Sequence, residues 1–376
     1  MLIAVNTRLL LKNRLEGIGW FMHENLKRIT VQHPEHDFLF LFDRPWSPEF
    51  IYSGNIRPLV VPPPTRHPVL WYLWFEKMLP RILKKHGAQL YLGPDGYMPL
   101  NANIPCHITL HDINFHHRPE DLPRFTRHYY TKYFPRFAEH AARIATVSEY
   151  SKRDISGSYG IEPGKIDVVY NGVNEIFSPL SPSEVSQYRK KYTGDKPYFI
   201  FIGAMHPRKN LTNLLKGFDL FREKYGLDYR LVIVGERMFR TRAMENIIRG
   251  MKYRKDVIFT GRLSPHELRN ALGASEGLTF LPFFEGFGIP LLEAMQCGIP
   301  ILASNVTSLP EIAAEAAIYA DPGNPGEIAE GMMCLASDSG LTGRLVKSGR
   351  ERASAFSWDK TSVLYWNSIC RVIESC

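Results

Sequence analysis

The sequence contains few cysteines and no long apolar run. Five cysteines stand at positions 106, 297, 334, 370 and 376 of 376 residues, and no two form a Cys-x-x-Cys pair. An odd, scattered set argues against a disulfide framework or a structural zinc site and favours a reducing compartment. The apolar run at the start of the sequence is too short for a signal peptide. No stretch reaches the ~18 apolar residues of a membrane span. We therefore expect a cytoplasmic protein.

Several familiar catalytic motifs are also missing. The chain has no Walker A motif, no G-x-S-x-G and no Asp-x-Asp. Closely spaced carboxylates of the Asp-x-Asp kind hold the divalent metal in many enzymes that bind nucleotide diphosphates. The histidines near position 111 fit none of the usual zinc spacings. The sequence therefore predicts no metal and no bound cofactor.

Charge and composition leave several partners open. Lysine and arginine exceed aspartate and glutamate by 46 to 38, a net charge of +8, and 44% of the residues are hydrophobic. The hydrophobic fraction excludes a disordered chain. The positive excess favours an anionic partner, which is a nucleic acid, a phosphorylated ligand or an anionic membrane surface.

Short apolar runs alternate with longer amphipathic segments along the chain. Most of these runs are rich in Val, Ile, Leu and Phe and do not alternate, as in strands buried on both faces. The expected strands are 2–6, 38–42, 56–61, 88–92, 105–110, 143–147 and 166–170, then 198–202, 230–234, 256–260, 278–281, 299–303 and 317–320. Helical patterns between them, such as 210–225, 264–274 and 325–337, predict an α/β fold with parallel sheets.

A cluster of turn formers and prolines at 171–184 separates the two series of strands. We expect two Rossmann-like doubly wound domains, one over 1–175 and one over 176–356. Residues 357–376 form a closing helix that is expected to pack back on the first domain. Ligands of such folds bind outside the carboxyl ends of the strands, so an interdomain cleft is the expected binding place.

The segment 282–300 carries the most chemical information. Gly286 and Gly288 allow a tight turn and close backbone approach, and a helix is expected to begin at Pro290. Amide groups near residues 289–292 would then face an anion at the helix N-terminus. Glu285 and Glu293 suit hydrogen bonds from sugar hydroxyls. The alternative is a helix cap with two solvated glutamates.

Three further stretches follow expected strands. Arg208 and Lys209, after the strand that ends at Gly203, suit a diphosphate, although such a pair is often only a solvated loop. His111 ends another strand and is a candidate hydrogen-bond donor or proton shuttle. The Gly-Ile-Gly turn at 17–19 is placed to approach a ligand phosphate or sugar, but it is not a full G-x-G-x-x-G.

A basic and aromatic stretch lies at residues 66–85. The window 51–100 has six Lys and Arg against two Asp and Glu, and it holds Trp71-Tyr-Leu-Trp-Phe75 and Arg81-Ile-Leu-Lys-Lys85. Aromatic side chains beside lysines suit the surface of an anionic membrane, here the inner face. A buried helix with a solvated basic end is the equal alternative.

Taken together, these motifs resemble a known family. Glu285 and Glu293 have the spacing of an E-x7-E motif, and the stretches at 147–152, 170–173, 304–311 and the Gly-Ile-Gly loop match in order. The sequence resembles the retaining glycosyltransferases of family 4, which have the GT-B fold. One departure is Ala204, where many relatives have an arginine after the glycine matched by Gly203, so Arg208 is the expected substitute.

The resemblance implies that the domain over 1–175 binds the acceptor and that the domain over 176–356 binds the nucleotide sugar. It also implies a role for each matched position. Glu293 would bind the ribose, Glu285 and the amides of 286–288 would face the donor sugar, and Arg208 with Lys209 would neutralise the leaving diphosphate. His111 would lie beside the reacting sugar, and Gly235 near the base. The implied catalytic residues are His111, Glu285, Arg208 and Lys209. The implied donor-binding residues are Gly17, Gly19, Gly203, Arg208, Lys209, Gly235, Glu285, Gly286, Phe287, Gly288, Ile289, Pro290, Leu291, Leu292 and Glu293.

The expected activity is therefore transfer of a hexose from a nucleotide-diphosphate sugar to a glycan or lipid-linked acceptor, in cell-surface polysaccharide synthesis. GDP-mannose is slightly favoured as donor and a UDP-sugar is next. The resemblance implies a retaining and metal-independent reaction. An alternative is a sugar-nucleotide epimerase of the same fold, which needs no acceptor. A nucleic-acid binder rests on the net charge alone, because no nucleic-acid module is recognisable.

Overall fold

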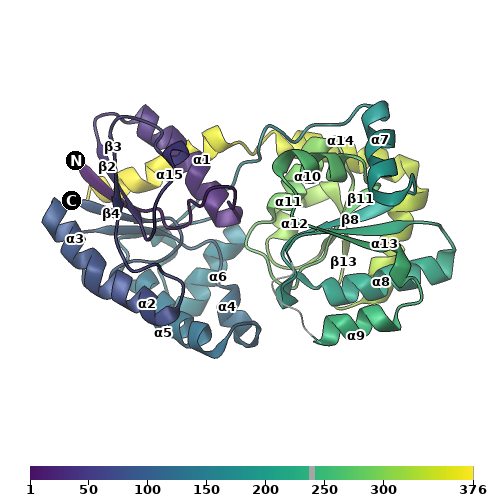
Figure 1. Ribbon diagram of the computed structural model, residues 1–376, viewed down its shortest axis with the longest axis horizontal. Coiled ribbons are helices and arrows are strands. Elements are labelled where there is room, and N and C mark those ends of the chain that lie inside the picture. The colour runs from purple at the N-terminus through teal and green to yellow at the C-terminus, as the bar shows by residue number, and fades with distance from the viewer. Residues whose placement is uncertain (237–241, 376) are drawn as a thin grey trace. The chain divides into compact units, whose positions relative to one another are not determined.

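The computed structural model describes residues 1–236 and 242–375. The chain divides into two compact units; in Figure 1 the first runs from purple to teal and includes the yellow C-terminal helix, and the second runs from teal to yellow-green. The first unit comprises Met1–Gly172 and the residues from Trp358 onward, and the second comprises Val173–Ser357. Each unit has its own parallel sheet with helices, so the predicted fold class is confirmed.

The first unit is built on a seven-stranded sheet of order β3-β2-β1-β4-β5-β6-β7, whose pairs are all parallel. The strands are β1 (Leu2–Asn6), β2 (Asp37–Phe42), β3 (Ile56–Val60), β4 (Leu90–Gly93), β5 (Cys106–Thr109), β6 (Arg143–Thr146) and β7 (Ile166–Val168). The central strand β4 is buried throughout. This accounts for its unbroken apolar run, since helices cover both faces of such a sheet.

Helices of the first unit flank this sheet. They are α1 (Gly17–Gln32), α2 (Pro68–Tyr72), the π-helical turn η2 (Leu73–Met78), α3 (Leu79–His86), α4 (Asn114–His117), α5 (Arg124–His140), α6 (Glu149–Tyr159) and α15 (Trp358–Ile373). The last helix packs on α1, where the rings of His33 and Trp366 stack at 3.9 Å. Tyr365 and Ile369 of α15 are fully buried in the same core as Phe21.

The second unit has a six-stranded parallel sheet of order β10-β9-β8-β11-β12-β13. Its strands are β8 (Tyr198–Ile202), β9 (Arg230–Val234), β10 (Val257–Gly261), β11 (Gly277–Phe280), β12 (Ile301–Ser304) and β13 (Ala317–Ala320). Its helices are α7 (Pro182–Thr193), the short 3-10 turn η5 (Pro207–Lys209), α8 (Leu211–Tyr225), α9 (Arg242–Gly250), α10 (Pro265–Gly273), α11 (Ile289–Cys297), α12 (Leu309–Ala313), α13 (Pro325–Ser337) and α14 (Ser339–Ala353).

Local sequence explains where several helices begin and end. Ser181 and Ser264 each accept a hydrogen bond from the amide three residues on, and the glutamate there closes a capping box. Gly160 and Gly194 end α6 and α7 in the left-handed conformation. Within the described residues, no helix combines the length and apolarity that crossing a bilayer requires.

Candidate functional site

The first part of the candidate site is the carboxyl edge of the second sheet, where a glycine directly follows both β8 and β9. The Gly203 amide donates to the Val234 carbonyl at 2.9 Å. A Cβ on Gly235 would lie 2.0 Å from the Gly203 carbonyl oxygen, and the φ of Gly235 is 149°. Only glycine fits at this position, so the two backbones form a bare edge with no side chain between them.

Arg208 and Lys209 lie on η5, directly after this edge. The His206 ring caps the turn, because Nδ1 accepts from the Arg208 amide at 3.2 Å. The next residue, Asn210, is left-handed with a φ of 59°. Its buried amide group donates to the carbonyls of Leu281 and Pro322 at 2.9 and 2.6 Å. These bonds fix the end of η5 against the loops that follow β11 and β13.

Glu285 brings both cations together. Arg208 Nη1 donates to Glu285 Oε2 at 2.8 Å, and Lys209 Nζ contacts the same oxygen. Arg208 also donates to the Phe284 carbonyl at 3.1 Å, while the Lys209 ammonium lies 4.9 Å from the centre of the Phe280 ring. The three side chains are each less than a quarter exposed. The sequence placed these residues in one site, and the structure brings them into contact.

The charges of this cluster are unequal. Burial by itself would raise the pKa of the Glu285 carboxyl, but the nearby Lys209 and Arg208 outweigh burial and hold that pKa below its ordinary value. The cluster thus carries two cations and one ionised carboxylate at neutral pH. Two cations held side by side at the carboxyl end of a parallel sheet favour an anionic ligand.

The loop from Gly286 to α11 forms the predicted tight turn. The predicted set of backbone amides at the start of α11 is only partly correct. Gly288 has a φ of 96°, and a Cβ there would lie 2.6 Å from Cδ2 of Leu309. The Ser308 hydroxyl donates to the Glu285 carbonyl at 2.8 Å and ties the loop to α12. The Leu291 amide donates to the Gly288 carbonyl at 2.9 Å. The prediction of amides available over 289–292 is therefore corrected at Leu291, and Pro290 has no N–H.

Glu293 lies on α11, one residue after the buried pair Leu291 and Leu292. Its side chain is partly buried, and loss of hydration raises its pKa to about 8. Such a carboxyl gains from any ligand group that donates hydrogen bonds to its charged form. No group of three or more His, Cys, Asp or Glu with metal-binding geometry occurs in the described parts of either unit.

His111 lies in the first unit, just after β5. Its Nε2 is 2.9 Å from the Pro94 carbonyl, which can only accept, so the ring proton is on Nε2 and Nδ1 is left as an acceptor. The ring packs edge-on against Phe21 at 4.9 Å between centroids. Burial lowers the pKa of the His111 imidazole. This effect is larger than the combined effect of the hydrogen bond to Pro94 and the charges of Asp112 and Asp95, which raise that pKa. The neutral ring is therefore the stable form near pH 7.

The Gly-Ile-Gly turn forms the start of α1 in the same unit. Gly17 is exposed and is the first residue of the helix. Gly19 is buried, and a Cβ there would lie 3.2 Å from the Leu9 carbonyl oxygen and from Cδ2 of Leu15. Packing against the preceding loop thus accounts for Gly19, and contact of either glycine with a ligand stays a prediction.

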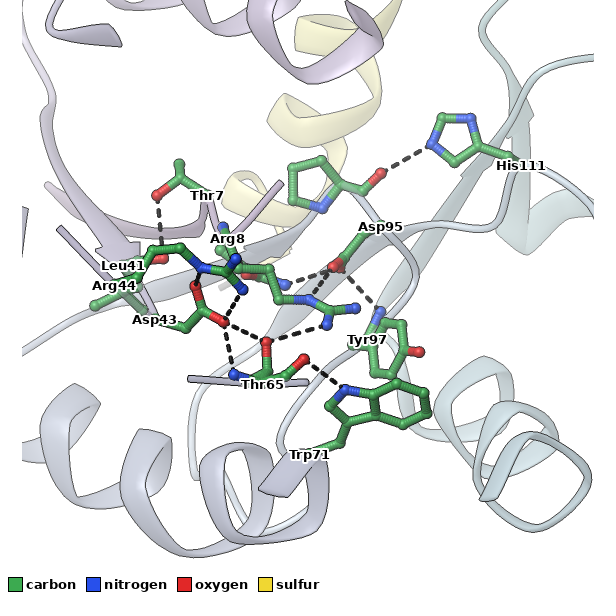
Figure 2. A network of polar contacts seen from close by, with 12 residues as sticks. Thr7, Arg8, Leu41, Asp43, Arg44, Thr65, Trp71, Asp95, Tyr97 and His111 are labelled. Atoms are coloured by element: carbon green, nitrogen blue, oxygen red, sulfur yellow. Dashed lines mark hydrogen bonds and ion pairs between the residues drawn. The ribbon is translucent and has the colours of Figure 1, made fainter. Parts of the chain in front are cut away.

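A polar network at the carboxyl ends of β1 and β4 was missed by the sequence analysis (Figure 2). Arg8 Nε donates to Asp95 Oδ2 at 2.7 Å, and Asn6 Nδ2 donates to Asp95 Oδ1 at 2.8 Å. The Arg8 guanidinium also lies 4.2 Å from the centre of the Tyr97 ring. Arg8, Asp95 and Asn6 are all buried.

The network continues to β2. Asp43 accepts from the amide and hydroxyl of Thr65 at 2.7 and 2.6 Å, and Arg8 Nη1 reaches the same hydroxyl at 3.3 Å. Arg44 forms two hydrogen bonds to Asp43. The signal that could have revealed this network is simple, since Asn6 ends a buried strand and Asp43 and Asp95 follow closely after two others.

Two family models match the chain, one over most of each unit. The model described as "Glycosyltransferase Family 4" matches residues 28–176, and the one described as "Glycosyl transferases group 1" matches residues 185–352. The sequence is 28% identical over 278 residues to the O-antigen chain mannosyltransferase B of Escherichia coli, with 74% of this chain and 73% of that protein covered. The O-antigen chain mannosyltransferase RfbU of Salmonella typhimurium is 27% identical, with 68% and 67% covered.

Solved structures agree in fold. Sucrose-phosphate synthase of Thermosynechococcus elongatus has a TM-score of 0.81 at 16% identity, over all of both chains. HepE of Anabaena, solved with UDP and glucose, has a TM-score of 0.76 at 16% identity, over 100% of this chain and 99% of that one. The two sheets and these matches define a glycosyltransferase of the GT-B fold. The chain belongs to glycosyltransferase family 4.

Proposed function

We propose that this chain is a retaining hexosyltransferase that moves mannose from GDP-mannose to a glycan or lipid-linked saccharide during synthesis of a cell-surface polysaccharide in the cytoplasm. The observation that carries the proposal is the contact of Arg208 and Lys209 with the single carboxylate of Glu285. Two mannosyltransferases of O-antigen chains among its relatives support mannose. A UDP-sugar is the next donor, since HepE was solved with UDP-glucose.

The geometry of the second unit provides what departure of a nucleotide diphosphate requires. The bond from the sugar C1 to the phosphate oxygen breaks as negative charge collects on the diphosphate. Fixed cations stabilise that charge most when they are already in place, as η5 and Glu285 hold them here. In this proposal the two side chains supply the positive charge, and the reaction needs no metal.

Other residues would orient the donor and the acceptor. Glu293 would accept from the ribose hydroxyls, and Gly203 and Gly235 would let the nucleotide approach the backbone. His111 would offer Nδ1 as an acceptor to the reacting sugar, since its Nε2 proton is held by Pro94. The acceptor hydroxyl would attack C1 from the face that the diphosphate leaves, and its proton would pass to the leaving phosphate. The configuration at C1 is then retained.

The test is product analysis by NMR. The purified chain is incubated with GDP-mannose or a UDP-sugar, with and without a mannose-containing oligosaccharide as acceptor. The proposal predicts an acceptor-dependent product with the α configuration of the donor. An inverted product would refute retention. Release of nucleotide and an epimerised sugar without acceptor would favour the epimerase instead, although none of the relatives described above is named as one.

A further inference from the structure

The helical segment of residues 68–86 and helix α5 carry exposed apolar side chains in the first unit. Val69, Tyr72 and Leu73 are 58%, 37% and 40% exposed, and Phe125 at the start of α5 is 71% exposed. Phe125 is the most exposed large hydrophobic side chain in the described residues. Exposing such groups to water is unfavourable, and a cluster of them marks a contact surface.

These four side chains belong to one patch. Helices α2 and α5 lie side by side (Figure 1), and they are in contact. The His67 ring, which precedes α2, lies 5.9 Å from the Phe125 ring. Tyr72 lies 6.4 Å from Tyr133 of α5. We call Val69, Tyr72, Leu73 and Phe125 the apolar patch.

Exposed cations continue from the patch along the same two helices. They are Lys77, Arg81, Lys84 and Lys85 on the first segment, and Arg124, Lys132 and Arg136 on α5. The two carboxylates within these segments are Glu76, which is buried and accepts from Leu100 and Asn101, and Glu139 near the end of α5. Lys77 lies four residues after Leu73 and is therefore its neighbour on the helix surface. Its ammonium group lies 5.7 Å from the centre of the Tyr72 ring, so the cations begin at the edge of the apolar patch.

The apolar patch is not the same set of residues as the aromatic stretch at 71–75 that suggested a membrane contact from the sequence. Trp74 and Phe75 are fully buried in the core of the unit, and Trp71 is partly buried with its indole N–H bonded to the Thr65 carbonyl. The buried-helix interpretation is thus correct for these aromatics. It does not account for the apolar patch, which the sequence window alone did not single out and which includes a residue of α5.

The spread of the cations indicates the kind of partner. From Leu73 to Lys85 the helix advances about 18 Å, so the positive charges extend well beyond the reach of a single phosphate group. Apolar and aromatic side chains next to lysines on one face are the features of helices that lie in a lipid interface.

We propose that this face docks the protein on the surface of an anionic lipid bilayer. The apolar patch enters the headgroup region, and the cations from Lys77 to Lys85 and from Arg124 to Arg136 contact anionic headgroups. The proposal is independent of glycosyl transfer, because docking is measured without donor or acceptor.

The experiment is co-flotation of the full chain with vesicles of phosphatidylcholine alone or of equal parts phosphatidylcholine and phosphatidylglycerol. We expect binding only to the anionic vesicles, weakened by salt. Lys84→Ser with Lys85→Ser should lower the partition coefficient about twentyfold. Leu73→Ser with Phe125→Ser keeps the charge and should lower it at least about tenfold.

The control is Val363→Ser with Leu364→Ser, which removes two exposed apolar side chains of α15 that are 53% and 42% exposed. This variant should float as the unchanged protein does. Thermal unfolding of every variant checks that it is folded. The proposal is overturned if the protein does not bind anionic vesicles, if the control variant loses as much binding as the patch variant, or if the face binds duplex DNA and not lipid.

Discussion

Arg208 Nη1 lies 2.8 Å from Oε2 of Glu285, and Lys209 contacts that same oxygen from the neighbouring position on η5. One carboxylate therefore holds two cations that are consecutive in sequence. The arrangement fixes the position of both positive charges next to each other. Each part of the proposed chemistry depends on this relationship.

Replacing Lys209 by alanine tests the role of the cluster in catalysis. If Lys209 stabilises the charge on the departing diphosphate, Lys209→Ala should lower kcat about 10²–10³-fold, the usual loss for one fixed electrostatic group. Steady-state kinetics with a saturating donor measures the effect. Lys216→Ala, which removes an exposed lysine of α8, is the control. Near-normal turnover of Lys209→Ala would remove the residue from the mechanism.

The raised pKa of Glu293 should make the free energy of unfolding of the chain depend on pH. Its pKa is raised from 4.5 to about 8, so between these values the folded chain binds a proton that the unfolded chain has lost. Stability is then greatest below about pH 4.5 and falls as the pH rises toward 8, by about 2–4 kcal/mol from this group. Glu293→Gln should remove that part of the fall in Tm.

The control for this measurement is Glu330→Gln, on an exposed residue of α13. It should leave the pH profile of Tm unchanged. If Glu293→Gln and Glu330→Gln have the same profile as the unchanged chain, burial of Glu293 has no influence on the stability of the second unit.

Gly235 tests the close approach of β8 and β9. Alanine at this position would place Cβ 2.0 Å from a backbone oxygen, in a conformation that L side chains rarely adopt. Gly235→Ala should therefore destabilise the chain by at least about 2 kcal/mol. Gly250→Ala, where no atom lies within 4 Å of the new Cβ, is the control. Thermal unfolding decides, and equal Tm values for the two variants would contradict the geometry.

The Arg8–Asp95 pair predicts strong coupling within the first unit. Asp95→Ala removes the partner of a buried guanidinium and should cost about 3–5 kcal/mol of unfolding free energy. Changing both, as Arg8→Met with Asp95→Ala, leaves no unpaired charge and should cost less than the sum of Arg8→Met alone and Asp95→Ala alone. Urea unfolding of the four proteins gives the coupling energy. Strict additivity would show that the two side chains do not interact.

The strands could be predicted because burial on both faces leaves a direct mark on the sequence. Runs such as residues 38–42 and 198–202 have no alternation, and both form strands that have a neighbouring strand on each side. The predicted helices at 210–225 and 325–337 correspond to α8 and α13. Their apolar positions recur with helical spacing, and Pro325 and Gly226 mark an end of each.

Contacts between residues that are far apart in the sequence were harder to predict. The family resemblance put Glu285 and Arg208 in one site, but it gave no sign that one carboxylate oxygen would bind two cations. Helical spacing likewise did not show which aromatics of 71–75 are buried, because that depends on packing in the core of the first unit. The availability of the Leu291 amide depended on a single turn bond to Gly288.

The central claim is that the second unit binds a nucleotide-diphosphate sugar through Arg208 and Lys209. Thermal unfolding with GDP, UDP, ADP and their sugar conjugates tests it most directly, because a ligand of the folded state raises Tm, and at equal concentration a tighter ligand raises it more. The account predicts a rise in Tm, largest with GDP-mannose, and a much smaller rise in Lys209→Ala than in Lys216→Ala. No response to any nucleotide, or an equal response in the two variants, would contradict it.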